Sequence, residues 1–271
     1  MQSIKVASVS MNGFLGEPDR VLKAIGGWCE RAAADKAQLV LFPELVVHGH
    51  CTPNTYDLAE AIPDGPSTQR LVQLAKHYKL FLSVGMSEKE RDIVYNTQVL
   101  VGPDGFIGKQ RKLHLSRDEV IFYKGGRELL VFDIGPCKVG TSICYDTQFP
   151  EVSRILALKG ADVLLLPHAA RIKMWDETPA SQAAARKHSH DYFRLYGLRA
   201  IENACFAVVS DQVGRAGLVD TYPKDHFNQP NHAGAALIIG PDGEVLASTQ
   251  EKEIKEEMIS ATLDSALLAV L

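Results

Sequence analysis

The sequence has no long apolar run and no excess of charge of one sign. None of its apolar stretches approaches the roughly 18–20 residues that a helix needs to cross a bilayer. Its 271 residues include 29 Lys and Arg and 33 Asp and Glu, interspersed along the chain, with a net charge of −4. That balance gives neither a basic face for nucleic acid nor a polybasic patch for a membrane surface. We therefore expect no nucleic-acid partner and no membrane partner.

Cysteine is scarce and irregularly spaced. The five cysteines are Cys29, Cys51, Cys137, Cys144 and Cys205. An odd number without regular spacing, in a chain of this length, argues for reduced thiols. The N-terminus runs straight into a strand-like pattern and lacks the layout of a signal peptide. Together these features predict a cytoplasmic protein.

Motifs for metal and nucleotide binding are also missing. No CxxC or HExxH pattern occurs, and neither His48 with His50 nor His188 with His190 has further ligands at suitable spacing. We predict no metal site at either pair. The stretch 102–109 ends in Gly-Lys, but it has five residues between its outer glycines and no Ser or Thr after the lysine, so it is not a phosphate-binding loop.

No linker rich in Pro, Ser or Gly divides the chain, so we predict a single domain over residues 1–271. Strand-like runs alternate with helical ones, and apolar runs such as 39–42 and 163–166 indicate sheets buried by helices. The predicted strands are 4–10, 38–42, 80–86, 94–101, 106–111, 139–143, 162–166, 206–210, 235–239, 244–248 and 258–262. The predicted helices are 18–34, 67–78, 149–158 and 180–203.

A hairpin pattern occurs once in each half of the chain. Residues 99–107 and 237–245 each read as a strand, a Gly-Pro-Asp-Gly turn and a returning strand. Proline is preset for the first central position of such a turn, and glycine supplies a positive φ. Hairpins in a chain that otherwise reads βαβ indicate a mixed sheet in each half. The predicted fold class is α/β with mixed sheets, stacked face to face with helices outside as a four-layer αββα sandwich.

Cys144 lies between a strand-like run, 138–143, and a helix-like run that begins at Tyr145. This turn is expected at the carboxyl edge of a sheet, where α/β folds bind their ligands. Backbone N–H groups and the positive end of a helix dipole favour a thiolate there. We therefore predict that Cys144 is a nucleophile.

Two other strand ends carry charged residues that can complete a reactive site: Glu44 after the strand at 38–42 and Lys112 after that at 106–111. A cysteine hydrolase must move a proton to the departing amine and stabilise the charge of a tetrahedral intermediate. Glu44 can carry the proton, while Lys112 and the backbone N–H of Tyr145 can hold the oxyanion. The residues alone equally allow a solvent-facing glutamate and an ordinary surface lysine.

Three short motifs, in order, resemble the signature of the nitrilase superfamily of carbon–nitrogen hydrolases. They are Phe42-Pro43-Glu44-Leu45, Arg111-Lys112-Leu113-His114-Leu115 and Ile143-Cys144-Tyr145-Asp146. The resemblance extends over nearly the whole chain. It implies the αββα sandwich, a site of Glu44, Lys112 and Cys144, no metal or organic cofactor, and a homodimer or larger homo-oligomer.

The resemblance also implies further site residues. Glu119 takes the place of a second glutamate that many members carry soon after the lysine, where it is expected to position Lys112 and the substrate amide and to help with proton handling; Asp118 beside it is the alternative. In the family the segment after the first glutamate lines the substrate pocket, which implies substrate contacts from His50 and Tyr56.

The chain departs from the family where members commonly carry an arginine, because Gln148 stands there. Thr147 and Gln148 cannot supply the bidentate cationic fork that holds a substrate carboxylate. Arg171, in the loop after the strand at 162–166, can supply positive charge instead. The chain also ends soon after residue 264, whereas nitrile-hydrolysing members usually have a longer tail, which favours an amidase over a nitrilase.

The predicted activity is hydrolysis of a non-peptide C–N bond in a small amide, through a thioester on Cys144 and with release of ammonia. The alternatives are an amidohydrolase of N-carbamoyl amino acids or amines, a nitrilase and, from another class, an idle binding or assembly subunit. The segment 188–196 reads either as a solvated helix face or as a pocket cover or subunit contact.

Overall fold

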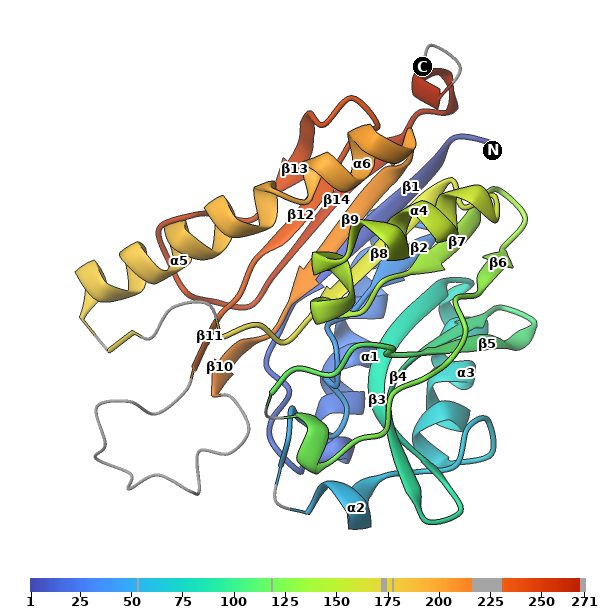
Figure 1. Cartoon of the computed structure of the whole chain (residues 1–271), viewed down its shortest axis with the longest axis vertical. Helices are drawn as coiled ribbons and strands as arrows, with labels where there is room; N and C mark the ends of the chain where they lie inside the picture. The colour runs from blue at the N-terminus through green and yellow to red at the C-terminus, as the bar shows by residue number, and fades with distance from the viewer. Residues whose placement is uncertain (53, 118, 172–174, 177, 216–230, 269–271) are drawn as a thin grey trace.

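The computed structural model describes residues 1–52, 54–117, 119–171, 175–176, 178–215 and 231–268. Its strands form two six-stranded sheets and a two-stranded ribbon (Figure 1). Within the described ranges, no helix combines the length and the apolarity that crossing a membrane requires.

The first sheet has the strand order β14-β1-β2-β3-β4-β5. Its strands β1, β2 and β3 are parallel, and the pairs β1–β14, β3–β4 and β4–β5 are antiparallel. The bounds are β1 (Ile4–Ser10), β2 (Leu39–Leu41), β3 (Phe81–Glu90), β4 (Ile93–Gly102), β5 (Gly105–Arg111) and β14 (Glu257–Leu263).

The second sheet has the order β13-β12-β9-β8-β7-β6 and repeats this plan. Strands β7, β8 and β9 are parallel, and the outer strands pair antiparallel. The bounds are β6 (Val131–Asp133), β7 (Lys138–Thr141), β8 (Val163–His168), β9 (Phe206–Asp211), β12 (Ala236–Ile239) and β13 (Val245–Ser248). A separate ribbon pairs β10 (Val213–Arg215) with β11 (Asn231–Ala233).

All eleven predicted strands are present, and both Gly-Pro-Asp-Gly hairpins form, as β4–β5 and β12–β13. Strands β6, β10 and β11, each of three residues, were not predicted.

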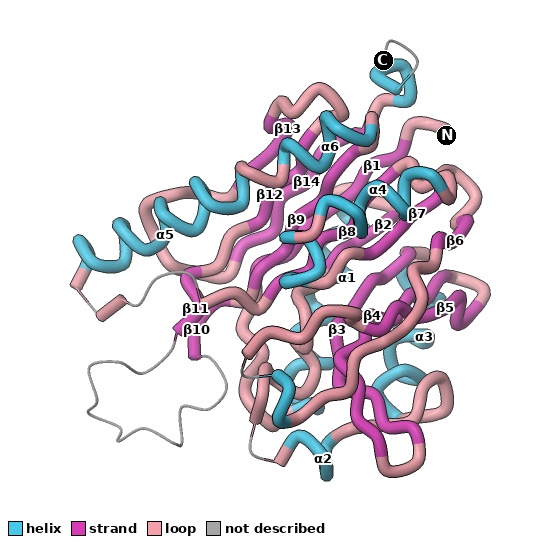
Figure 2. Tube along the Cα trace, in the orientation of Figure 1, coloured by secondary structure: helices cyan, strands magenta, loops and turns pink. Residues whose placement is uncertain are grey.

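Helices cover the outer face of each sheet, and three apolar clusters separate the four layers. One cluster joins α1 and α3 to the first sheet, a second lies between the sheets, and a third joins α4, α5 and α6 to the second sheet. Figure 2 shows the strands of the two sheets with the helices outside them. The αββα prediction is therefore confirmed. The helices are α1 (Pro18–Ala34), α2 (Thr55–Leu58), α3 (Pro66–Tyr78), α4 (Pro150–Leu158), α5 (Pro179–Arg194) and α6 (Gly197–Asn203), with 3-10 turns η1 (Glu119–Ile121), η2 (Cys144–Gln148) and η4 (Ser265–Leu268).

Serine side chains join the two sheets where β1 faces β9. Ser8 Oγ donates to the carbonyl of Val209 at 2.6 Å, and Ser210 Oγ donates to that of Val9 at 2.6 Å. Ser10 Oγ reaches the carbonyl of Asp211 at 2.9 Å. Small hydroxyl side chains let the backbones approach closely while their polar groups stay paired. The carboxyl ends of the parallel strands of both sheets are thereby held side by side.

The prediction of one helix over 180–203 is wrong, because the segment contains two helices. After Arg194 the backbone tightens: Leu195 N–H donates to Tyr192 O and Tyr196 N–H to Phe193 O, an i to i−3 pattern. Such 3-10 turns often end or redirect a helix. Gly197, directly after the tightened turn, is the residue in this stretch that lowers helix stability.

Arg186 anchors α5 to the rest of the fold. Its side chain is fully buried and donates to the carbonyls of Ala233 at 2.8 Å and Gln250 at 3.0 Å. It also pairs with Glu257 on β14 at 2.8 Å. A buried charge is tolerated only when it is paired and hydrogen-bonded, so these contacts fix the helix in place.

We predict that Arg186→Met lowers the free energy of unfolding by about 3 kcal/mol, because it leaves Glu257 and two backbone carbonyls without their buried partner. Denaturant unfolding followed by circular dichroism measures the change. The control is Arg194→Met on the same helix, whose half-exposed ion pair with Glu251 contributes less than about 1 kcal/mol. Equal effects of the two substitutions would contradict the role of Arg186 as an anchor.

Candidate active site

The Lys112 ammonium lies between two buried carboxylates. Lys112 follows β5, and its N–H donates to the carbonyl of Asn96 on β4 at 2.8 Å. Its Nζ is 2.6 Å from Glu44 Oε1 and 2.8 and 2.7 Å from the two oxygens of Glu119. All three side chains are at most 1% exposed. The structure thus brings together three of the predicted residues; Asp118 lies outside the described residues.

The turn after β2 aims Glu44 into the site. Leu45 has φ +49°, and Gly85 of β3 lies directly against this turn. A Cβ at Gly85 would come within 2.3 Å of Leu45 N, so only glycine permits this approach. The other Glu44 oxygen, Oε2, accepts from Ala169 N at 2.7 Å, and its carbonyl accepts from Gln212 Nε2 at 2.7 Å.

Asn96 joins the two carboxylates, and the sequence analysis did not find it. Its Nδ2 donates to Glu44 Oε1 at 2.7 Å and to Glu119 Oε1 at 2.8 Å. The side chain is buried on the central part of β4. A polar residue inside a strand was the available signal, but Thr97 and Gln98 beside it are polar too, and the partners of Asn96 are distant in sequence.

Cys144 opens η2 with φ +49°, a conformation that costs energy for a residue with a side chain. All five cysteines lie within the described residues; four are buried, and Cys144 is partly exposed. The N–H of Ala169 donates to Glu44 Oε2, and its hydrogen bond to the Cys144 sulfur lowers the pKa of that thiol. The sulfur and the Glu44 carboxylate therefore face the same backbone group.

Asp146 ties the nucleophile turn to the lysine segment. Its carboxylate, 1% exposed, accepts from the backbone N–H groups of Leu113 at 3.1 Å and His114 at 2.7 Å. Asp146 comes two residues after Cys144, and its two partners directly follow Lys112. Their hydrogen bonds therefore hold the backbone next to the nucleophile against the backbone next to the lysine. Asp146 stands in a motif used for the resemblance, yet its positioning role was not anticipated.

The charge state of Cys144 in the free enzyme differs from the sequence-based expectation. Burial and the Glu44 charge raise the pKa of Cys144 well above its ordinary value, and the opposing effects of Lys112 and Ala169 N–H are smaller. The predicted preference for thiolate is therefore wrong for the resting site. The physical reason is that the turn after Cys144 is a five-residue 3-10 turn and α4 begins only at Pro150, while two carboxylates lie nearby.

Lys112 and Glu119 stabilise each other's charged forms. Burial opposes the charge on Lys112, but Glu44, Cys144 and Glu119 together raise its pKa. Burial likewise opposes the charge on Glu119, but Lys112 and His50 hold the pKa of that carboxyl below its usual range. Both groups are therefore ionised at neutral pH.

A cavity of about 200 Å³ opens at Cys144. Three of the predicted substrate contacts, His50, Tyr145 and Arg171, line it. Its other lining residues come from the loop after β5, from η2, from the end of β8 and the loop after it, from α5 and from the turn after α5: Ser116, Gln148, His168, Ala169, Ala170, Tyr192 and Tyr196. A cavity this small suits a small molecule rather than a drug-sized one.

Tyr56 is not brought to this cavity. Its ring is 47% exposed and lies under the Lys89 ammonium, 3.8 Å from the ring centroid. Its hydroxyl donates to Asp92 at 3.4 Å. Tyr56 lies on the short helix α2, which faces the β3–β4 hairpin, so its neighbours are surface residues of that hairpin.

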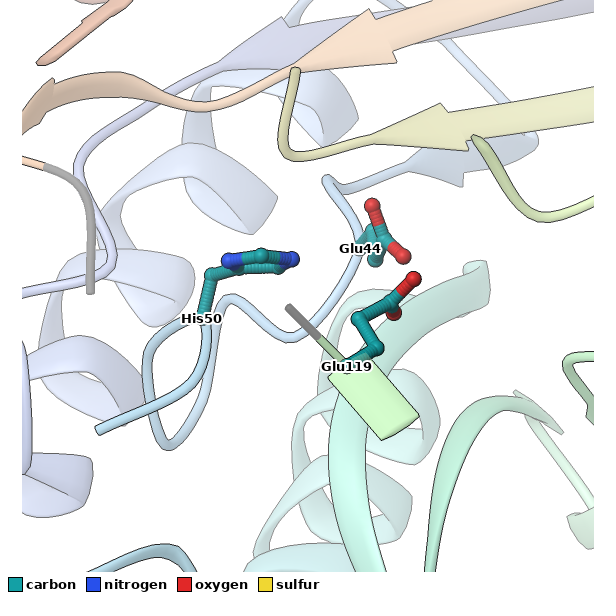
Figure 3. Close-up of side chains that lie close together, drawn as sticks. All are labelled: Glu44, His50 and Glu119. Atoms are coloured by element: carbon teal, nitrogen blue, oxygen red, sulfur yellow. The ribbon is translucent and has the colours of Figure 1, made fainter. Parts of the chain in front are cut away.

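Glu44, His50 and Glu119 could together offer a metal ion one nitrogen and two oxygens. One ligand atom from each lies within 4.8 Å of the others, and all three residues are buried. Figure 3 shows the His50 ring directed toward the two carboxylates. Lys112 already donates to both carboxylates, so a positive charge is present between them without a metal. His48, the other histidine of that pair, points elsewhere and accepts a hydrogen bond from Ser87 N at 3.0 Å.

The family model for carbon–nitrogen hydrolases matches residues 5–270. The chain belongs to the carbon–nitrogen hydrolase family. The resemblance seen in the sequence is thereby confirmed, and the class of reaction is hydrolysis of a carbon–nitrogen bond.

Individual relatives span this hydrolase almost completely. A protein named Nitrilase from Pyrococcus abyssi is 36% identical, over 98% of this chain and 91% of that protein. The Omega-amidase NIT2 of Xenopus tropicalis is 30% identical, over 89% and 81%. The crystal structure of Saccharomyces cerevisiae Nit3, a member of branch 10 of the nitrilase superfamily, has a TM-score of 0.79 and 26% identity, over 99% and 93%.

Three buried histidines around the site predict a loss of stability in mild acid. Burial lowers the pKa of His50, of His168 and of His232, the last to about 3. The unfolded chain takes up these protons below a pH of about 6.5, while the folded chain does not. The free energy of unfolding should therefore fall as the pH drops below about 6.5, by up to about 1.4 kcal/mol per pH unit for each histidine.

Denaturant unfolding at several pH values between 7.5 and 5 measures this slope. His232→Asn keeps a donor toward the Ala170 carbonyl, which His232 Nδ1 contacts at 3.2 Å. This variant should reduce the slope of the unfolding free energy against pH by the contribution of one histidine. A variant with the wild-type slope would show that His232 does not titrate in this way.

Proposed function

We propose that this carbon–nitrogen hydrolase cleaves the C–N bond of a small amide through a thioester on Cys144, with release of ammonia. The observation that carries the proposal is the Lys112 ammonium held at 2.6–2.8 Å between the carboxylates of Glu44 and Glu119, at a cavity that exposes the Cys144 thiol. A nucleophile, a proton carrier and a fixed positive charge are the parts that acyl transfer requires.

In the first half of the reaction the neutral thiol must lose its proton as it attacks. Glu44 shares the Ala169 N–H with the sulfur, so it is placed to accept that proton while the S–C bond forms. The carbonyl oxygen becomes an oxyanion, held by the Lys112 ammonium and the N–H of Tyr145. Glu44 then gives the proton to the amide nitrogen, the C–N bond breaks, and ammonia leaves.

In the second half water hydrolyses the thioester. Glu44 takes a proton from water as the water oxygen bonds to the carbonyl carbon, and the same donors hold the second oxyanion. The S–C bond then breaks, the sulfur regains a proton from Glu44, and the carboxylic acid departs. Glu119 does not exchange protons in this scheme. Its ionised carboxylate keeps Lys112 charged and in place through two hydrogen bonds.

The cavity supports a small amide as the substrate. Its volume is about 200 Å³, and among the described lining residues the side chain with a permanent charge is that of Arg171. This composition disfavours cationic amides and permits neutral or acidic ones. It fits short amides, ω-amides of dicarboxylic acids and N-carbamoyl amino acids.

Nitrile hydrolysis is the second candidate, because the 36% identical relative from Pyrococcus abyssi is named Nitrilase. An ammonia-release screen separates the candidates. It compares short amides, ω-amidated dicarboxylates, N-carbamoyl amino acids and the corresponding nitriles. Turnover of nitriles alone would replace the amidase proposal, and no turnover with no labelling of Cys144 by electrophiles would support an idle binding or assembly subunit.

The predicted homodimer or larger homo-oligomer, the single domain over residues 1–271 and the cytoplasmic location stay predictions. Exposed apolar side chains on α4 and α6 are compatible with a contact between copies of the chain: Ile155, Leu158, Leu198 and Ile201.

We predict that Cys144→Ala lowers ammonia release by at least about 10⁴-fold, because it removes the sulfur that forms the acyl intermediate. Mass spectrometry of the intact wild-type protein with a slow amide should show an acyl adduct on Cys144. Cys205→Ala is the control, since that thiol is buried against the Ala161 carbonyl and should leave turnover unchanged. Persistent turnover by Cys144→Ala would reject the mechanism.

We predict that Asn96→Asp lowers kcat by about 10²-fold or more, because it puts a third carboxyl group within 3 Å of Glu44 and Glu119 and displaces both. Steady-state kinetics measure the loss. Gln98→Glu is a matched control on β4, whose side chain contacts the Phe42 carbonyl and Ser83 instead of the carboxylates. A larger loss of kcat in the control would show that charge on β4, rather than the Asn96 bridge, determines the effect.

A further inference from the structure

Helix α5 supplies one wall of the catalytic cavity. Tyr192 in its last turn and Tyr196 just after it line the cavity together with Cys144. Figure 1 shows α5 running along the outer face of the second sheet. Of the two interpretations of the segment 188–196, the structure therefore favours a pocket wall for its second half.

A chain of hydrogen bonds ends at the Tyr192 hydroxyl. Gln148 Nε2 donates to Tyr196 Oη at 3.1 Å and also to Tyr192 Oη. Tyr196 Oη in turn donates to Tyr192 Oη at 3.2 Å. Within the described part of the chain, both hydrogen bonds of Tyr192 Oη are accepted ones, so its own proton is available to a ligand. Two accepted hydrogen bonds also polarise the hydroxyl and make it a stronger donor.

This wall is rigid relative to the nucleophile. The Tyr196 ring is 5% exposed and stacks on the His168 ring, with centroids 5.1 Å apart and an interplanar angle of 17°. Arg199 of α6 donates to the carbonyl of Thr147 in η2 at 3.1 Å, which ties the helices to the turn that carries Cys144. A donor on a rigid wall loses little conformational entropy when a ligand binds.

The phenols stay protonated in the working enzyme. Burial raises the pKa of Tyr192 and of Tyr196, and a charge on the Cys144 sulfur raises both further.

We infer that the Tyr192 hydroxyl binds an acceptor oxygen at the end of the substrate remote from the scissile amide, and that it sets specificity among small amides. The inference rests on the proposed function. The ligand class is a small amide with a carbonyl or carboxylate oxygen at its far end. An ammonium group at that end finds no acceptor at Tyr192, because the hydroxyl oxygen already accepts two hydrogen bonds. Arg171 on the same cavity lining adds favourable Coulomb energy for a carboxylate over a neutral carbonyl.

The test uses four amides of similar length that differ at the far end: pentanamide, 4-oxopentanamide, glutaric acid monoamide and 5-aminopentanamide. Wild-type enzyme should prefer the two with an acceptor oxygen, with the monoamide ahead of the ketone. Tyr192→Phe should raise KM about 10-fold for these two, as expected for a lost hydrogen bond, and change kcat by less than about 2-fold. Its effect on KM for pentanamide should be much smaller.

Two variants serve as comparisons. Tyr196→Phe removes only one of the two bonds that Tyr192 accepts, so it should raise KM for the same two amides by a smaller factor. Tyr95→Phe removes a tyrosine hydroxyl outside the cavity, where the ring packs against Arg111, and should leave all four amides unchanged. An equal KM increase for pentanamide and glutaric acid monoamide in Tyr192→Phe would overturn the inference, because a merely structural role affects both alike.

A binding measurement separates this inference from the proposed activity. Cys144→Ala and the double variant Cys144→Ala, Tyr192→Phe are titrated calorimetrically with glutaric acid monoamide and with pentanamide. The second substitution should weaken binding of the monoamide about 10-fold and that of pentanamide much less. If wild-type enzyme hydrolyses none of the amides while this difference holds, the proposed activity fails and the subsite stands. If the difference is absent, the subsite fails whatever the activity.

Discussion

The buried ammonium of Lys112 between Glu44 and Glu119 is the interaction on which the rest of the site depends. None of the three charges is stable there alone, because an unpaired ion inside a protein costs several kcal/mol. The Lys112 ammonium pairs with both carboxylates, and the Asn96 amide donates a further hydrogen bond to each of them. The cluster carries one negative charge in total when all three are ionised. Burial, together with that residual charge, keeps the neighbouring Cys144 as a thiol, so its attack must be coupled to proton transfer.

The sandwich makes this cluster possible by bringing strand ends of different sheets to one place. Glu44 follows β2 and Lys112 follows β5 of the first sheet, whereas Cys144 follows β7 and Ala169 follows β8 of the second. The serine contacts between β1 and β9 fix the relative height of the two sheets. A shift between the sheets would separate the sulfur from the carboxylate that has to receive its proton. The fold therefore works as the positioning device of the reaction.

Sequence patterns were sufficient for features that depend on local chemistry. Alternating strands and helices with two Gly-Pro-Asp-Gly hairpins predicted the sandwich. Charged residues at strand ends suggested Glu44 and Lys112, and the resemblance to the family added Glu119. Features that depend on partners distant in the sequence were not predicted. Asn96 and Asp146 are ordinary polar residues until the fold brings a carboxylate or a pair of N–H groups to them. The charge state of Cys144 was mispredicted for a related reason. The local sequence indicates a helix dipole, but the burial and the neighbouring carboxylates come from the tertiary structure.

Chemistry and selectivity have different origins in this chain. The ionic cluster comes from the first half of the chain, where Glu44 and Lys112 stand in segments that resemble the family signature. The wall that faces the substrate includes Tyr192, on a helix anchored by the buried Arg186 and not by the catalytic residues. A change on α5 can therefore alter the far end of the cavity without disturbing the charges around Lys112. Because hydrogen-bond donors discriminate between ligands that differ by one oxygen, such changes can redirect specificity while the bond-breaking apparatus is kept.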